Sequence, residues 1–189
     1  MKRNITLGLL LLAMMCCVVP VHAQRFGGPE RMKGKIIVGG HVGAGYSGRT
    51  LHFSVSPQVG YRLTRSLELG TRLGYSLSYH AYTAYGTFFN HYFSGALYGN
   101  YEIFRGLYVH AEDEVVCGLV TGPAIETSAS RWYNSVLVGG GYRQYSGSSY
   151  VFYSLLYDLS WDYLYEDSPY ANPFIVRMGV CFALDGKRR

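Results

Sequence analysis

The segment His52-Phe-Ser54 places a serine two residues after a histidine. Serine becomes a nucleophile when an imidazole accepts its proton, and that imidazole needs a carboxylate to orient it. Side chains two residues apart on a β-strand lie on the same face, so a strand here would give the pair the required geometry. The same spacing arises often by chance. A catalytic role for His52 and Ser54 is therefore the least favoured of the functions considered below.

A second group of residues is ionisable and interrupts otherwise apolar segments. Its members are His41, Arg62, Glu68, Arg72, Glu112, Glu114, Arg143, Asp158, Asp162 and Arg177. Buried charges require partners, so a shared interior would hold these side chains as a network of ion pairs. Cys117 and Cys181 belong to no Cys-x-x-Cys motif or Cys/His cluster. We therefore expect neither a bound metal nor a cofactor.

The elements that must position these residues have a hydrophobic period of two. From Leu51 to Leu63 the odd positions are almost all apolar, and the even positions are His, Ser, Gln, Gly and Arg. Such alternation gives a strand one apolar and one polar face, whereas a helix would scatter the same residues around its axis. The pattern predicts eight strands, at 36–46, 51–63, 67–80, 91–104, 107–119, 132–145, 151–163 and 173–183.

The connections between these segments alternate in length after the first. Short turns fall at 64–66, 105–106 and 146–148, and longer loops fall at 81–90, 120–131 and 164–172. Strands of 10–14 residues exceed the roughly 5–6 residues of an average globular strand and suit a tilted membrane span. The sequence therefore predicts an all-β fold, an eight-stranded antiparallel up-and-down transmembrane barrel.

The orientation of the apolar face distinguishes a membrane barrel from a soluble one of the lipocalin kind. No lysine occurs between Lys35 and Lys187, although water-facing β-surfaces commonly use lysine. Aromatic residues gather toward the strand ends, as in the girdles of membrane barrels. These girdle residues are Tyr61, Tyr101, Tyr142 and Phe182 at the short-turn end, and Tyr79, Phe93, Trp132, Trp161, Tyr163 and Phe174 at the long-loop end. We expect the apolar face to meet lipid.

The first residues have the features of a leader. Lys2 and Arg3 precede an apolar run that ends at Val-His-Ala, which predicts a secretory signal peptide over 1–23. Its removal lowers the formal net charge from +5 to +3, too little to indicate a nucleic-acid partner. The remaining chain divides into an N-terminal periplasmic segment at 24–35, the barrel at 36–183 and a basic tail at 184–189. After residue 25 no apolar run is long enough for a membrane-spanning helix.

The leader, the eight alternating segments and the final strand Phe174-Ile-Val-Arg-Met-Gly-Val-Cys-Phe182 resemble the small OmpA/OmpX-type outer-membrane β-barrel proteins. The resemblance implies an integral protein of a Gram-negative outer membrane, with both termini in the periplasm. Its partners would be phospholipid, lipopolysaccharide and, during biogenesis, the barrel-assembly machinery. One departure is that residues follow the last aromatic Phe182, where the family commonly ends.

The predicted lumen of an eight-stranded barrel is only just wide enough for side chains, so we expect the charged residues to plug it. A non-enzymatic structural or surface-interaction role, through the loops at 81–90, 120–131 and 164–172, follows from that expectation. The alternatives are a narrow channel, a transporter of small molecules, and a lipid A-modifying enzyme that uses His52 and Ser54.

Three local expectations accompany this fold. Asp113 falls on the lipid-facing side of its strand, so we expect a β-bulge near 111–114 that shifts the register. Pro57 lacks a backbone donor and predicts a local distortion. Near mid-height, Asp158, Arg177 and His41 should lie side by side on neighbouring strands.

Overall fold

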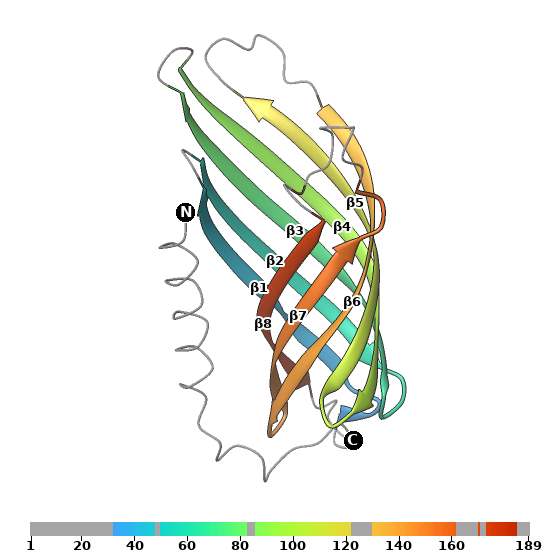
Figure 1. Cartoon of the computed structure of the whole chain (residues 1–189). Helices are drawn as coiled ribbons and strands as arrows, with labels where there is room; N and C mark the ends of the chain where they lie inside the picture. Colours follow the sequence, from blue (N-terminus) through green and yellow to red (C-terminus); the bar gives the residue numbers. More distant parts are fainter. Residues whose placement is uncertain are drawn as a thin grey trace, which may run out of the picture.

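The computed structural model describes residues 32–47, 50–82, 86–121, 130–161, 170 and 173–184. Figure 1 shows a barrel of tilted strands, with the short turns between β4 and β5 and between β6 and β7 at its lower end. Its strands are β1 (Ile36–Ser47), β2 (Thr50–Arg62), β3 (Leu67–Tyr82), β4 (Gly86–Phe104), β5 (Leu107–Thr121), β6 (Ser130–Ser146), β7 (Ser149–Asp158) and β8 (Phe174–Leu184). The predicted leader, Asp162, Tyr163 and the tail beyond Leu184 lie outside the described residues.

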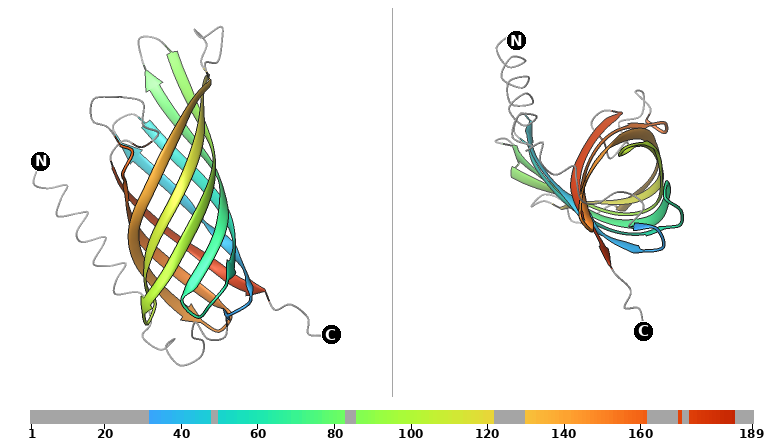
Figure 2. Two further views of the ribbon diagram at one scale, coloured as in Figure 1. Left: turned by 90° about the vertical axis from the view of Figure 1, so that its right-hand side faces the viewer. Right: turned by 90° about the horizontal axis from the view of Figure 1, so that it is seen from below.

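Each strand pairs antiparallel with the next, and β8 returns to β1 to close the barrel. This confirms the predicted fold class. The strands tilt strongly around the barrel (Figure 2).

Two predicted boundaries are wrong. β3 and β4 continue as a paired hairpin up to Tyr82 and Gly86, so most of the predicted loop at 81–90 is strand. β7 ends at Asp158, five residues before the predicted end. The prediction was too long because the apolar alternation in the sequence continues past the last paired residue.

The turns at the short-turn end have the backbone chemistry that their sequences indicate. Arg105 and Gly106 both adopt positive φ angles, of 43° and 92°, between β4 and β5. Gly147 has a φ of 61° between β6 and β7. Positive φ is accessible to glycine at little cost, so these positions allow two-residue reversals. In the turn after β2, Thr64 Oγ1 accepts hydrogen bonds from the backbone N–H groups of Ser66 and Leu67.

The two faces of the sheet differ sharply in chemistry. Large apolar side chains cover the outside, among them Leu73, Leu97, Trp132, Leu155 and Val176, each more than half exposed. The charged residues point inward: buried inside are Arg62, Glu68, Arg72, Glu102, Glu112, Glu114, Arg143, Asp158 and Arg177. Among the described residues, no helix has the length and apolar character needed to cross a membrane.

The seam between β1 and β8 is paired over only part of its length. Within the described residues its register runs from Ile36–Leu184 to His41–Gly179, which is six pairs. The other seven neighbouring strand pairs each have nine or more. Toward the long-loop end the two strands diverge, and Figure 1 shows β1 and β8 separating above their paired halves.

The bulge expected near 111–114 is absent from the described strands. Residues 111–114 keep an uninterrupted register with both β4 and β6, and the shift in β4–β5 falls between Glu102 and Phe104 instead. Asp113 stays on the outer face, where Asn134 of β6, with its amide nitrogen turned toward β5, donates to Asp113 Oδ1 at 3.1 Å. The carboxylate is accommodated by this neighbour rather than by a change of register.

Pro57 interrupts the ladder without shifting it. The β2–β3 register passes from Val55–Tyr75 to Gln58–Arg72 and omits Ser56 and Pro57. Because proline has no N–H group to donate, the local loss of pairing is the distortion that the sequence predicts.

Candidate functional site in the barrel interior

The half of the lumen nearest the short turns, here called the lower lumen, is built around Glu68 of β3. Its Oε2 lies 2.9 Å from Arg143 Nη1, an ion pair whose alignment is poor for a hydrogen bond. The hydroxyl of Tyr150 donates to Glu68 at 3.2 Å, and Tyr98 and Asn100 approach Oε1 at 3.4 Å. Glu68 and Arg143 are both almost fully buried, so this contact neutralises two charges that have no access to solvent.

The Arg143 guanidinium is also enclosed by two aromatic rings. Its Cζ lies 4.6 Å from the ring centroid of Tyr108 and 4.7 Å from that of Tyr150. Cation–π contacts of this kind are strongest where water is excluded. Tyrosine rings and one ion pair therefore fill most of this cross-section.

A second ion pair lies closer to the short-turn end. Arg62 Nη2 contacts Glu102 Oε2 at 2.5 Å, and Tyr145 donates to the same carboxylate oxygen. Met32, just before β1, is fully buried beside Arg62 and packs in an apolar cluster. That cluster consists of Met32, Ile37, Tyr150, Phe152, Cys181 and Ala183. The chain segment preceding β1 thus closes the lower end of the lumen.

Above this level four charges form one connected group, here called the upper cluster: Arg72, Glu112, Glu114 and Arg177. Arg72 pairs with Glu112 and, at 3.0 Å, with Glu114. Arg177 Nη1 donates to Glu112 Oε2 at 2.9 Å, and its Nη2 lies 3.6 Å from Glu114. Two cations and two anions balance, and all four side chains are buried.

Two neighbours extend the upper cluster. His110 Nε2 contacts Glu112 Oε2 at 3.2 Å, and its Nδ1 contacts Asn100 at 2.7 Å, which links the upper cluster to the lower lumen. Tyr170, from the connection before β8, turns inward and donates to Glu114. Burial, followed by the charge of Glu114, raises the pKa of Tyr170, so its hydroxyl stays neutral and donates.

Two cavities of very different size lie on either side of the upper cluster. The lower one holds about 20 Å³ between Tyr98, His110, Arg143 and Arg177, enough for roughly one water molecule. The other holds about 360 Å³ toward the long-loop end. It is here called the upper cavity, and its wall includes His41, His52, Ser54, Arg72, Tyr92 and Tyr170 together with Val42, Val176 and Met178 at the seam.

His52 and Ser54 both line the upper cavity. His52 Nδ1 lies 2.8 Å from the hydroxyl of Ser78 on β3. Among the described residues, no group of three or more His, Cys, Asp or Glu side chains has the arrangement to hold a metal ion.

Of the expected trio of Asp158, Arg177 and His41, the last two line the same cavities, but Asp158 does not join them. Arg177 lies opposite Ser154 and pairs with the two glutamates of β5, whereas Asp158 lies opposite Leu137 near the end of β7. Asp158 Oδ1 accepts from the backbone of Ser160, and Oδ2 has no hydrogen-bond partner within the described part of the chain. The prediction failed because antiparallel register depends on the lengths of the connections, which alternation alone does not supply.

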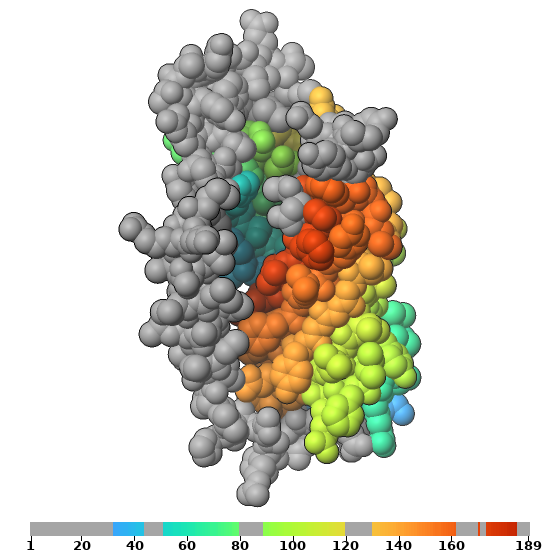
Figure 3. All heavy atoms as spheres, in the orientation of Figure 1, coloured from blue at the N-terminus to red at the C-terminus, as the bar shows by residue number. Residues whose placement is uncertain are grey.

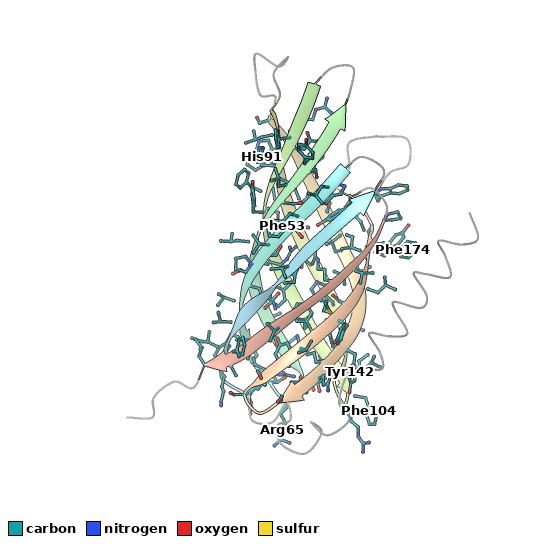
Figure 4. All side chains as sticks on the ribbon, turned by 90° about the vertical axis from the view of Figure 1, so that its left-hand side faces the viewer. Phe53, Arg65, His91, Phe104, Tyr142 and Phe174 are labelled. Carbon is teal, nitrogen blue, oxygen red and sulfur yellow. The ribbon has the colours of Figure 1, made fainter. Side chains whose placement is uncertain are left out.

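The aromatic residues divide between the outside and the lumen. Most of the predicted girdle side chains are exposed: Tyr61, Tyr79, Phe93, Tyr101, Trp132, Tyr142, Phe174 and Phe182. Trp161 is half-exposed and follows the end of β7. Figure 4 shows Phe104 and Tyr142 near the short turns, with Phe53 and Phe174 farther along the barrel.

Sequence reasoning missed the inward tyrosines. Tyr98, Tyr108 and Tyr150 are buried in the lower lumen, and Tyr145 borders it. Tyr98 has the strand parity of Glu102, Tyr108 that of Glu112 and Tyr150 that of Asp158. Strict use of alternation would therefore have found them.

No protein-family model and no curated protein matches this chain. Among solved structures, the crystal structure of the N-terminal β-barrel domain of Pseudomonas aeruginosa OprF is similar, with 13% identity and a TM-score of 0.49. The match covers 80% of this chain and 98% of that domain. The closed ring of eight antiparallel strands is the fold that the resemblance to OmpA/OmpX-type barrels implies.

Proposed function

We propose that this protein is an integral barrel of a Gram-negative outer membrane, without enzymatic activity, whose lumen is closed to ions by its own side chains. The single observation that carries the proposal is the inversion of polarity across the sheet. Leucine, valine and aromatic side chains cover the exterior, while nine of the described arginine, glutamate and aspartate side chains are buried inside. A water-soluble barrel would bury the apolar face instead.

Lipid accounts for both faces. In hydrocarbon every backbone polar group must be paired internally, and a closed barrel of strands satisfies that requirement. The exposed aromatic rings near the two ends of the barrel suit the interfaces where amphipathic rings meet headgroups. In such a membrane the exterior contacts phospholipid and lipopolysaccharide, and insertion requires the barrel-assembly machinery.

Closure of the lumen rests on three successive layers. Met32 and the Arg62–Glu102 pair occupy the short-turn end, Arg143 and Glu68 lie next among tyrosine rings, and the upper cluster follows. The space between the last two layers holds about 20 Å³. Ions could pass only after all three of these layers rearrange.

The biological role is then structural or interactive rather than conductive. The barrel is a rigid scaffold for the connections at the long-loop end, where function commonly resides. We assign contact with a surface partner to the predicted loops at 120–131 and 164–172, most of which lie outside the described residues.

Conductance of the full-length protein, refolded into planar lipid bilayers, tests this proposal. The wild type should insert, as judged by heat-modifiable migration in gels and by protease protection, and should remain electrically silent. A triple variant, Met32→Gly with Glu68→Ala and Glu112→Ala, removes material from all three layers and should show small openings. Steady openings of the wild type would refute the closed lumen, and failure of the folded barrel to enter lipid would refute the membrane assignment.

A further inference from the structure

The strands β1 and β8 stop pairing at the level of the upper cavity. The last pair is His41–Gly179, and the next residues, Val42 and Met178, already line the cavity. Figure 3 shows a hollow at this place, with interior strands visible between β1 and β8. The cavity is therefore connected to the outer surface sideways, through the wall of the barrel.

The outer side of this opening is apolar. Val42 and Val176 are among the most exposed apolar side chains of the protein. A second, shallower groove of about 510 Å³ adjoins the opening on the outer face, with Val55, Pro57 and Val180 in its wall. An apolar chain lying in this groove would reach the cavity without leaving apolar surroundings.

The inner side is lined by hydroxyl groups. The inward-facing cavity wall includes Ser54, Ser56, Ser76, Ser94 and Tyr92. Two buried nitrogens of its lining residues, Arg72 Nε and His41 Nδ1, have no hydrogen-bond partner among the described residues. Arg72 is 4% exposed, and its Nε–H group requires an acceptor. The hydroxyl groups of the wall can bind the oxygen atoms of a polar ligand.

The charges of the cavity floor are already balanced. Arg72 and Arg177 are neutralised by Glu112 and Glu114, so an added anion or cation would meet no free countercharge on this described floor. A ligand that carries a full charge would lose hydration without compensation. An uncharged, hydroxyl-bearing polar group fits the floor and walls.

We propose that the upper cavity binds an uncharged amphiphile through the side of the barrel, with its hydroxyl-bearing head inside and its single acyl chain passing between β1 and β8. The inference rests on the proposed membrane placement, because lipid around the barrel supplies such molecules. A volume of about 360 Å³ lies within the range of about 300–1,000 Å³ typical of small-molecule sites. The partly paired seam is the entry path.

Native mass spectrometry of the full chain, released from detergent micelles, tests the binding. The probe is 1-monooleoylglycerol, and the comparison ligands are oleate, which has the same chain with a carboxylate, and glycerol, which has no chain. We expect one molecule of 1-monooleoylglycerol per barrel, markedly weaker retention of oleate and none of glycerol. Equal or tighter retention of oleate, or no retention of 1-monooleoylglycerol, would overturn the proposal.

Matched substitutions at Ser54 test the location. Ser54→Phe fills the cavity and should weaken retention by about tenfold or more, whereas Ser54→Ala removes one of several hydroxyl groups and should weaken it by no more than about threefold. Ser76→Phe and Ser76→Ala serve the same purpose on β3 if Ser54→Phe does not fold. Unaltered binding by a folded phenylalanine variant would contradict the assignment to this cavity.

A fluorescence measurement tests the path of the chain. In a Cys117→Ser background, bimane attached at Val42→Cys should be quenched by substoichiometric 1-monoacylglycerol with a brominated chain, and bimane at Val136→Cys on β6 should be quenched much less. Equal quenching at the two sites would refute entry through the seam. A protein that inserts into lipid and stays silent in bilayers, yet binds no amphiphile, would overturn this inference alone and leave the proposed function intact.

Discussion

The lower lumen and the upper cavity are lined by the same alternating strands, but side chains fill the first region and leave the second open. Below the upper cluster, Tyr98, Tyr108, Tyr150 and Phe152 point inward and leave about 20 Å³. Above it, serine and glycine occupy the corresponding positions, and about 360 Å³ remains. The paired half of the seam adjoins the filled region and the unpaired half adjoins the cavity. The size of the inward residues, rather than their polarity, distinguishes a plug from a pocket in this barrel.

The largest expected effect on stability comes from removing the carboxylate of Glu68 in the lower lumen. The matched change beside the upper cavity removes the carboxylate of Glu114. Glu68→Gln leaves Arg143 buried without an anion and should lower the free energy of unfolding by about 3–5 kcal/mol. Glu114→Gln should cost only about 1–2 kcal/mol, because Glu112 still contacts both Arg72 and Arg177 and the adjoining cavity lets water solvate the remaining charge. Equilibrium urea unfolding in lipid vesicles measures both variants.

The double variant Glu68→Gln with Arg143→Met is the control for this comparison. It removes both charges and should recover most of the stability lost in Glu68→Gln. If Glu114→Gln proves as costly as Glu68→Gln, the two regions do not differ in solvent access and the comparison fails.

The next effect concerns the level at which the seam opens. A Cβ atom at Gly179 would overlap the carbonyl oxygen of Gly40 and approach the ring of Phe152 to 2.7 Å. Gly179→Ala should therefore force β8 away from β1 and destabilise the barrel by about 1–3 kcal/mol. On the outer face of β4, a methyl group added at Gly95 would have no described atom within 4 Å, so Gly95→Ala should be neutral or slightly stabilising.

Thermal unfolding followed by heat-modifiable gel migration separates these two alanine variants. A stable Gly179→Ala barrel would mean that the strands at the seam have room to adjust. In that case the change from paired to unpaired backbone would be gradual rather than fixed at His41–Gly179.

The smallest effect is on the outer face. Asp113 lies near the middle of β5, and its side chain is exposed at the level expected for the centre of the bilayer's hydrocarbon layer. Asp113→Asn keeps a polar contact with Asn134 and should raise the free energy of unfolding in vesicles by about 1 kcal/mol, since it removes a charge from lipid. In detergent the gain should shrink, because a micelle lets more water reach the carboxylate than a bilayer does. An unchanged stability in both environments would argue that this part of β5 does not face hydrocarbon.

Much of the fold follows from the sequence because alternation is a local property. The number of strands, their antiparallel order and the short turns at Arg105–Gly106 and Ser146–Ser148 agree with the structure. The end of β7 could not be predicted, because Leu159 and Trp161 continue the alternation after the strand has ended at Asp158.

The interior was harder to predict for a different reason. Parity indicates which residues share the lumen, and Arg72, Glu112 and Arg177 are indeed inside. Which of them meet depends on the stagger between strands, and so the trio with Asp158 was wrong. Tyr170 could not be assigned to the lumen by any periodic signal, since it follows no strand pattern and reaches Glu114 from a connection.

The seam between β1 and β8 joins the two ends of the chain, and its pairs are separated by more than 130 residues of intervening sequence. Closing so long a loop carries the largest entropic cost of any strand contact in the molecule. With few hydrogen bonds to offset that cost, those amides of Val42, Gly43 and Ile175–Met178 that point toward the seam, rather than toward β2 or β7, should exchange with solvent deuterium earliest. Local opening of the barrel would then begin where its two ends meet, long before the hairpins separate.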